Sequence, residues 1–207
     1  MSELILVRHG QSIWNLQNRF TGWYDVDLSD NGLSEAKKAG ELLVKKNIRI
    51  DFAYTSYLKR ANSTLKIILE NMKLENIGFT KSWEFNERHY GSLTGLNKSE
   101  MKEQLGEEKI KIYRRSWDIA PPELSEDSEF NPRNDIIYKG INEDAIPNTE
   151  SLKDTYDRVI PYFNINIRPK ILAGKNVIIA AHGNSLRALC KLPVSYTHLT
   201  LPTNREV

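Results

Sequence analysis

The amino-acid sequence predicts an α/β fold, a three-layer, doubly wound and mostly parallel sheet with helices on both faces. The first observation is that strand-like and helix-like segments alternate along most of the chain. The second is that residues 4–7 and 177–181 form apolar runs without polar interruption, which is typical of strands buried on both faces. The third is that a His-Gly pair, at His9 and at His182, follows each run. Ligands of such sheets bind beyond the carboxyl ends of the strands, where these histidines would lie.

The first half of the chain predicts alternating strands and helices. After the strand over residues 4–7, the sequence Asp30-Asn31-Gly32 predicts a turn, and apolar residues then recur at helical spacing from Leu33 to Leu43. Residues 51–56 predict a second strand, and residues 58–68 an amphipathic helix with its apolar stripe turned inward. Residues 77–80 predict a third, less apolar strand.

The second half contains a long irregular stretch before the pattern resumes. Residues 117–148 carry four prolines and no clear apolar period, which favours a functional lid, with a disordered insertion as the alternative. Residues 151–167 predict a helix that Pro161 should kink or end early, and residues 176–181 predict the most buried strand. The expected organisation is one domain over residues 1–191 and an atypical tail over 192–207.

Composition limits the classes of function. The 207 residues carry a net charge of +2 with scattered basic residues, which argues against a nucleic-acid partner. No apolar run approaches membrane-spanning length and no signal pattern begins the chain, so no membrane partner is expected. The single cysteine, Cys190, excludes an internal disulfide framework and fits a reducing, cytoplasmic compartment. No carboxylate cluster has the spacing of a metal site, so no metal is expected.

The two His-Gly motifs indicate chemistry on phosphate. The imidazole of His9 can attack phosphorus, and the guanidinium of Arg8 can hold phosphate oxygens in a planar fork. A single strand-end histidine is as readily explained by a hydrogen bond to a backbone carbonyl. The repeat of the motif at His182 favours the functional interpretation, because a parallel sheet would bring the two strand ends together.

Other residues fit a phosphate site but each has a structural alternative. Glu87 lies among aromatic and basic neighbours and could exchange a proton, or it could form an ion pair with Arg88. Arg60 follows the second predicted strand at the head of a helix, a position suited to phosphate. The Arg114-Arg115 pair is either a solvated helix face or a bidentate anion clamp.

Several motifs together resemble the cofactor-dependent phosphoglycerate mutases over about residues 3–191, in the family's order and spacing. They are Arg8-His9-Gly10, Asn15, Asn18-Arg19-Phe20-Thr21-Gly22-Trp23, Asn86-Glu87-Arg88-His89-Tyr90-Gly91, Arg114-Arg115-Ser116 and Ala181-His182-Gly183-Asn184-Ser185-Leu186-Arg187. The resemblance implies the histidine phosphatase superfamily fold. It also implies interconversion of 3-phosphoglycerate and 2-phosphoglycerate in glycolysis and gluconeogenesis, with 2,3-bisphosphoglycerate as the priming cofactor. The implied partners are small-molecule phosphoglycerates. The sequence leaves open whether the protein forms a homo-oligomer.

The resemblance also implies a role for each matching position. His9 would be the nucleophile that becomes phosphohistidine, Glu87 the general acid and base for the substrate hydroxyl, and His182 the residue that stabilises the transferring phosphoryl group. The remaining positions would bind substrate. Around the phosphoryl group these are Arg8, Asn15, Arg60, Gly183 and Asn184, and around the rest of the substrate they are Thr21, Gly22, Arg88, Tyr90, Lys98, Arg114 and Arg115.

Two other functions remain open at this point. A bisphosphoglycerate synthase or phosphatase of the same superfamily would share all of these residues. A catalytically impaired fragment that only binds phosphate is the second alternative, and the tail is its only support. After Lys191 the chain departs from the family pattern, whose members continue with a helix, a loop and a final edge strand. Residues 192–207 are expected to be translated adapter or vector sequence that leaves the sheet edge uncovered, and His198 receives no catalytic role.

Overall fold

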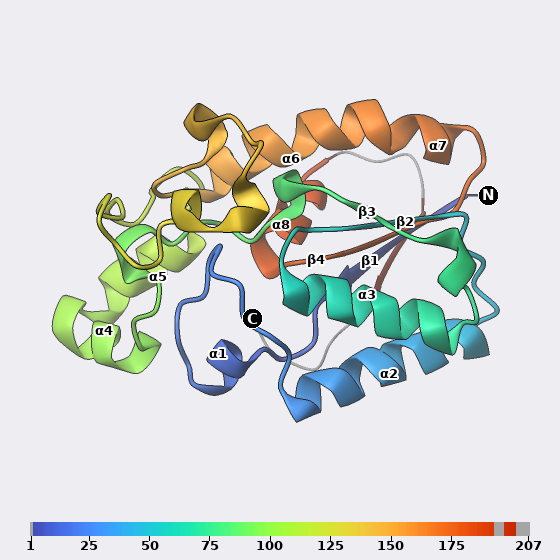
Figure 1. Cartoon of the computed structure of the whole chain (residues 1–207), viewed down its shortest axis with the longest axis horizontal. Helices are drawn as coiled ribbons and strands as arrows, with labels where there is room; N and C mark the ends of the chain where they lie inside the picture. Colours follow the sequence, from blue (N-terminus) through green and yellow to red (C-terminus); the bar gives the residue numbers. More distant parts are fainter. Residues whose placement is uncertain (1, 193–196, 202–207) are drawn as a thin grey trace.

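A parallel sheet with helices on both faces forms the centre of the computed structural model, which describes residues 2–192 and 197–201 (Figure 1). This confirms the predicted α/β fold. In the order β3-β2-β4-β1-β5 across the sheet, the strands are β1 (Glu3–Arg8), β2 (Phe52–Thr55), β3 (Thr80–Lys81), β4 (Val177–Ala181) and β5 (Thr197–Leu201). The α-helices are α1 (Ile13–Leu16), α2 (Asp30–Lys45), α3 (Lys59–Asn71), α4 (Lys98–Leu105), α5 (Glu107–Arg115), α6 (Leu152–Asn166), α7 (Arg168–Leu172) and α8 (Gly183–Leu189). Short 3₁₀ turns cover Glu75–Ile77, Trp83–Phe85, Gly91–Leu93, Pro132–Asn134, Ile136–Tyr138 and Glu143–Ala145.

The pairing of β1 with β4 places the two His-Gly motifs next to each other at the carboxyl edge of the sheet. Leu4 lies opposite Val177 and Arg8 opposite Ala181, so both strands end together. The next residue on the first strand, His9, donates its backbone N–H to the carbonyl of Ala181 at 3.0 Å. The sheet therefore places two histidines side by side although the sequence separates them widely.

The core divides into two layers because alternate residues of a strand face opposite sides. Ile5 and Val7 pack in one buried cluster with Leu65 of α3, and α2 covers the same face. Leu4 packs in a second buried cluster with Phe163 of α6. Figure 1 shows α2 and α3 on one side of the sheet and α6 and α7 on the other. Within the described residues, the helices are too short or too polar to cross a membrane.

One local prediction about helices is wrong, and in a second, for Pro161, the structure excludes one of the two alternatives. The expected turn at residues 30–32 is the first turn of α2, because the Ser29 hydroxyl accepts a hydrogen bond from the backbone N–H of Gly32 at 3.2 Å and caps the helix. The helix over residues 152–166 continues through Pro161 rather than ending there. Pro161 lies on the exposed side, while Val159, Ile160 and Phe163 are buried and hold the helix against the sheet.

The irregular stretch over residues 117–148 packs onto the domain. Tyr138 is buried, its ring stacks on Trp23 with 5.1 Å between centroids, and its hydroxyl donates to the Trp23 carbonyl at 3.1 Å. Near the two ends of the stretch, the backbone N–H of Leu124 donates to the carbonyl of Asn148 at 3.1 Å. The stretch thus has its own anchored geometry, built from 3₁₀ turns rather than from a periodic helix.

The sheet edge beside β1 is paired, so the expectation of an uncovered edge is wrong. Strand β5 runs parallel to β1, with Glu3 opposite Thr197 and Val7 opposite Leu201. A parallel ladder is formed by backbone groups, which every residue type other than proline supplies in full. The origin expected for the tail stays a prediction, and residues 193–196 and 202–207 lie outside the described residues.

Candidate active site

A cavity of about 340 Å³ opens at the carboxyl ends of the central strands. All of the predicted site residues except Arg88 and His182 line it. The lining residues are Arg8, His9, Asn15, Asn18, Arg19, Thr21, Gly22, Arg60, Glu87, Tyr90, Lys98, Ser99, Lys102, Arg114, Arg115, Gly183, Asn184 and Arg187. The fold therefore collects residues from six separate parts of the chain around one space.

His9 is held as a neutral imidazole with a defined tautomer. Its Nδ1 lies 2.6 Å from the carbonyl oxygen of Gly10, and because that oxygen can only accept, Nδ1 carries the hydrogen. The lone pair is then on Nε2. Burial lowers the pKa of His9 well below its usual range, and the charges of Arg60 and Arg8 lower it further. A neutral ring with a lone pair on Nε2 is the form that can attack phosphorus.

The loop after His9 is fixed by close backbone packing. The Gly10 N–H donates to Thr64 Oγ1 on α3 at 3.1 Å. A Cβ at Gly10 would lie 2.3 Å from the carbonyl oxygen of Gly32, and one at Gly32 would lie 2.1 Å from that of Gln11. Glycine is needed at both positions because the start of α2 touches this loop backbone to backbone.

His182 lies behind His9 rather than in the cavity wall. The two ring centroids are 4.9 Å apart, and the His182 side chain is fully buried. Its Nε2 lies 2.8 Å from Ser56 Oγ, and that hydroxyl also accepts from the backbone N–H of Leu58 at 3.1 Å. Burial lowers the pKa of His182 well below its usual range, followed by the charge of Arg60. The second histidine is thus neutral and fixed in contact with the first.

Glu87 presents a carboxylate that is fixed through one oxygen. Its Oε1 accepts from the backbone N–H of Arg88 at 2.8 Å, from that of Asn184 at 3.2 Å and from Asn184 Nδ2 at 2.9 Å. Arg187 Nη1 donates to Asn184 Oδ1 at 3.1 Å, which turns the amide nitrogen toward Glu87. The second oxygen, Oε2, takes part in none of these hydrogen bonds, which leaves it able to exchange a proton.

Eight cationic side chains and one carboxylate line the cavity. Arg60 is almost fully buried and donates to the carbonyls of Gly22 and Tyr24, at 2.8 and 3.0 Å. Burial lowers its pKa to about 10, so it remains charged at neutral pH. Arg114 and Arg115, at the end of α5, both line the cavity, with Arg114 half-buried and Arg115 exposed to solvent. This charge balance favours a small ligand with several negative charges.

Arg88 does not line the cavity, so a direct substrate contact is not what its position supports. Its side chain is fully buried, and Nη2 donates to the carbonyl of Arg114 at 3.1 Å. Its guanidinium carbon lies 4.9 Å from the centre of the Tyr90 ring. Arg88 therefore braces two residues that do line the cavity.

The sequence prediction missed five residues of the lining. They are Asn18, Arg19, Ser99, Lys102 and Arg187. Helical periodicity could have found two of them. Lys102 follows Lys98 by four residues on α4, and Arg187 follows Gly183 by four residues on α8, so each pair shares one helix face.

Comparisons with known proteins agree with this geometry. The family model described as histidine phosphatase superfamily (branch 1) matches residues 4–135. A 2,3-bisphosphoglycerate-dependent phosphoglycerate mutase of Pelagibacter ubique is 54% identical over 191 residues, which cover 92% of this chain and 80% of that protein. One of Parabacteroides distasonis is 50% identical over 208 residues, covering 98% of this chain and 84% of that protein.

Solved structures show the same fold at lower identity. A phosphoglycerate mutase from Bacillus anthracis matches with a TM-score of 0.67 at 21% identity, covering 91% of this chain and 78% of that chain. A mycobacterial glucosyl-3-phosphoglycerate phosphatase matches with a TM-score of 0.65 at 22% identity, covering 91% and 79%. On the family model and the two relatives of half-identical sequence, the chain belongs to the histidine phosphatase superfamily and, within it, to the 2,3-bisphosphoglycerate-dependent phosphoglycerate mutase family.

Proposed function

We propose that this protein interconverts 3-phosphoglycerate and 2-phosphoglycerate through a phosphohistidine at His9. The observation that carries the proposal is the meeting of a neutral His9 and the fixed carboxylate of Glu87 in one cavity with eight cations. A phosphoglycerate carries a phosphate and a carboxylate, which such a cavity would neutralise. The mutases that are 50% and 54% identical to this chain support the same activity.

The first step is phosphoryl transfer to His9. His9 Nε2 attacks one phosphorus of a bisphosphorylated glycerate, and the bond between that phosphorus and the glycerate oxygen breaks. Glu87, in its protonated form, gives its proton to the departing oxygen, which leaves a monophosphoglycerate. Arg8 and Arg60 line the cavity close enough to act on the charge of His9, and they would offset the charge on the phosphate oxygens. His182, in contact with the His9 ring, would hold that ring in line and supply a polar neighbour for the phosphoryl group.

The second step uses the same two residues in reverse. The Glu87 carboxylate takes the proton of a substrate hydroxyl while that oxygen accepts the phosphoryl group from His9. Repeating the first step at the other carbon returns the phosphoryl group to His9 and completes the shift of position. Glu87 thus alternates between acid and base, with Oε1 fixed by Asn184 in both states.

The cofactor 2,3-bisphosphoglycerate would supply the phosphoryl group that primes His9. The donor set fits it, because Lys98, Arg114, Arg115 and Arg187 line the cavity in addition to the arginines near His9. Residues 117–148 begin two residues after Arg115, and none of them lines the cavity. They would act as a lid by closing over the cavity and shielding the phosphohistidine from water. A cytoplasmic location belongs to the same proposal, and the single cysteine supports it.

The test is transfer of radioactive phosphate from 2,3-bisphosphoglycerate to the purified 207-residue chain. We expect an acid-labile label that mass spectrometry places on His9, and no label in His9→Ala. Conversion of 3-phosphoglycerate should then exceed hydrolysis of either phosphate. Label on the His9→Ala chain, or hydrolysis faster than conversion, would contradict the proposal, and the second result would identify a phosphatase instead.

A further inference from the structure

An ion pair between Glu150 and Arg158 lies behind the loop that carries Glu87 and does not line the cavity. Arg158 Nε donates to Glu150 Oε1 at 2.6 Å, and Arg158 Nη2 donates to Glu150 Oε2 at 2.9 Å. The side chain of Arg158 is 9% exposed and that of Glu150 is 2% exposed. A bidentate pair at this burial is held in one geometry, because breaking it would leave an uncompensated charge out of water.

The guanidinium of Arg158 also donates hydrogen bonds to three backbone carbonyls of the loop. Nη1 donates to the carbonyl of Glu84 at 2.5 Å, both Nη atoms contact that of Asn86 at 3.2 Å, and Nη2 donates to that of Glu87 at 3.0 Å. With Glu150, these acceptors occupy all five N–H groups of the arginine. The last carbonyl in the series belongs to the residue that we assign as acid and base.

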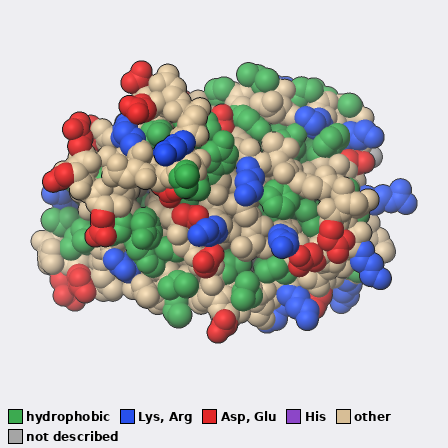
Figure 2. Space-filling view, in the orientation of Figure 1, with side chains coloured by type: hydrophobic (Ala, Val, Ile, Leu, Met, Phe, Trp, Pro, Cys, Tyr) green, Lys and Arg blue, Asp and Glu red, His purple; other side chains and the backbone are tan. Residues whose placement is uncertain are grey.

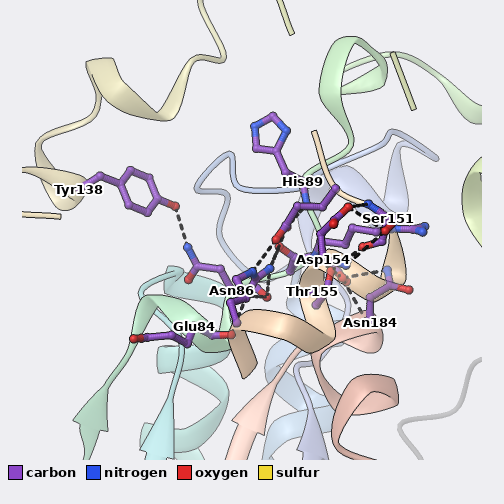
Figure 3. A network of polar contacts seen from close by, with 12 residues as sticks. Glu84, Asn86, His89, Tyr138, Ser151, Asp154, Thr155 and Asn184 are labelled. Atoms are coloured by element: carbon purple, nitrogen blue, oxygen red, sulfur yellow. Dashed lines mark hydrogen bonds and ion pairs between the residues drawn. The ribbon is translucent and has the colours of Figure 1, made fainter. Parts of the chain in front are cut away.

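Glu150 fixes the other end of the same loop. Its Oε2 accepts from the backbone N–H of His89 at 2.7 Å, and its backbone N–H donates to the carbonyl of His89 at 3.0 Å. Figure 3 shows this polar network beneath the His89 ring, which points away from it. The pair therefore forms hydrogen bonds with the backbone on both sides of Glu87.

The loop depends on these contacts because it has little regular structure. It forms one 3₁₀ turn at Trp83–Phe85 and another at Gly91–Leu93, and the residues between them belong to no strand or helix. The side chain of Asn86 makes two further hydrogen bonds that hold the loop. Its oxygen accepts from the backbone N–H of Tyr57 at 3.0 Å. Its nitrogen donates to the Tyr138 hydroxyl at 3.1 Å (Figure 3). The backbone of Glu87 itself is held through Arg158.

We propose that the Glu150–Arg158 pair is the positioning device for the proton-transfer group Glu87. The inference rests on the proposed function and extends it to two residues outside the cavity. Arg158 acts through the backbone, and it sets the depth at which the Glu87 carboxyl enters the site. Since a misplacement of about 1 Å can cost roughly a hundredfold in rate, a small slack in this loop would slow proton transfer selectively.

The critical variant is Arg158→Lys, which keeps the positive charge but replaces five planar donors by three on a flexible stem. Arg133→Lys is the matched control. Arg133 also holds loop backbone, donating to the carbonyl of Ile146 at 2.6 Å and to Asn148 Oδ1 at 2.6 Å, but its guanidinium hydrogen bonds all go to residues of the 117–148 stretch. Glu150→Gln tests the partner, since an amide cannot accept at both ends.

The measurement is the rate of phosphorylation of His9 from two donors that differ in their need for an acid. The alkoxide that leaves 2,3-bisphosphoglycerate requires the proton of Glu87, whereas the dinitrophenolate that leaves 2,4-dinitrophenyl phosphate departs as a stable anion. For Arg158→Lys we expect about a ten- to hundredfold loss with the first donor and a change within about twofold with the second. Arg133→Lys should leave the ratio of the two rates unchanged.

If the rates with both donors fell by the same factor in Arg158→Lys, or did not fall, their ratio would be unchanged. That result would overturn the positioning role while leaving the proposed function intact. A wild-type chain that neither donor phosphorylates would instead overturn the proposed function. In that case ¹³C NMR of the Glu87 carboxyl still decides the inference. Arg158→Lys should shift or broaden that resonance and Arg133→Lys should not, and an unaltered resonance in Arg158→Lys would sink the proposal.

Discussion

The reactive state of His9 arises from interactions on three sides of one ring. The carbonyl of the next residue, Gly10, selects the tautomer. The positive charges of the preceding residue, Arg8, and of Arg60 on α3 lower the pKa of His9. Burial contributes the largest effect on the pKa. The local part of this environment follows from adjacent residues, while the burial and the Arg60 contact exist only in the folded sheet. A nucleophile of this kind is therefore made jointly by a motif and by the fold.

Replacing Glu87 with glutamine should separate binding from proton transfer. The amide oxygen can accept the hydrogen bonds that Oε1 accepts from Arg88 and Asn184, so the side chain should keep its place. An amide cannot exchange the proton, so phosphorylation of His9 by 2,3-bisphosphoglycerate should slow by about 10²- to 10⁴-fold. Single-turnover labelling measures the rate, and the substrate dissociation constant should stay within about threefold.

Glu84→Gln is the matched control for this change. Glu84 lies three residues earlier in the same loop and is absent from the cavity lining, so its amide variant should label at the wild-type rate. A Glu87→Gln chain that also labels at the wild-type rate would show that another group moves the proton.

At the scale of the element, α6 combines an irregularity with a functional position. Pro161 lacks the N–H that would bond the carbonyl of Asp157, yet the helix runs on to Asn166. The helix survives because its buried face packs against the sheet, and that packing contributes more than one lost hydrogen bond costs. The same helix carries Arg158, so its continuation through Pro161 matters to the Glu87 loop.

Pro161→Ala should stabilise the protein by about 2 kcal/mol. An interior proline destabilises a helix by about 3 kcal/mol. Removing it also makes the unfolded chain more flexible, which reduces the gain in stability by about 1 kcal/mol. Urea unfolding monitored by circular dichroism gives the free energy of unfolding. Ile165→Ala, at a position 73% exposed on the same helix, should change it by less than about 0.5 kcal/mol. A Pro161→Ala chain that is less stable than wild type would mean that the proline contributes to the packing of α6.

The sequence predicts the central elements well and the connections between them less well. His9 and His182 could be found because they follow the apolar runs over residues 4–7 and 177–181, two residues and one residue beyond them, respectively. Arg187 and Lys102 could have been found only from the helical phase of short helices. The Glu150–Arg158 pair could not be found, because its partners are backbone groups some sixty to seventy residues away, which no side-chain pattern records. The pairing of β5 was missed for the same reason.

At the scale of the whole molecule, three buried neutral histidines link stability to pH. Burial is the first cause that lowers the pKa of His9 and His182, and it lowers that of His89 to about 3. In the unfolded chain each imidazole takes up a proton near pH 6.5. The unfolded state therefore binds more protons below that pH, and the free energy of unfolding must fall as the pH falls.

Acidification from pH 7.5 to 5.5 should lower the free energy of unfolding by up to about 4 kcal/mol, which is three imidazoles at about 1.4 kcal/mol each. Urea titrations at several pH values measure it. His89→Gln should remove about a third of the dependence, because glutamine can still accept from the Gly91 N–H that bonds His89 Nδ1. Stability that is flat or rises over this interval would show that these histidines are protonated in the folded protein.

The distribution of charge between the cavity and the outer surface acts as a filter by size. The cavity holds eight cations and one carboxylate, yet the whole chain carries only +2, so everything outside the cavity sums to −5. Figure 2 shows carboxylates interspersed with lysines and arginines over the outer face. A polyanion too large to enter meets a weakly acidic exterior and gains little, whereas a small phosphate that enters meets concentrated positive charge. This distribution of charge favours the binding of small anions over that of nucleic acids.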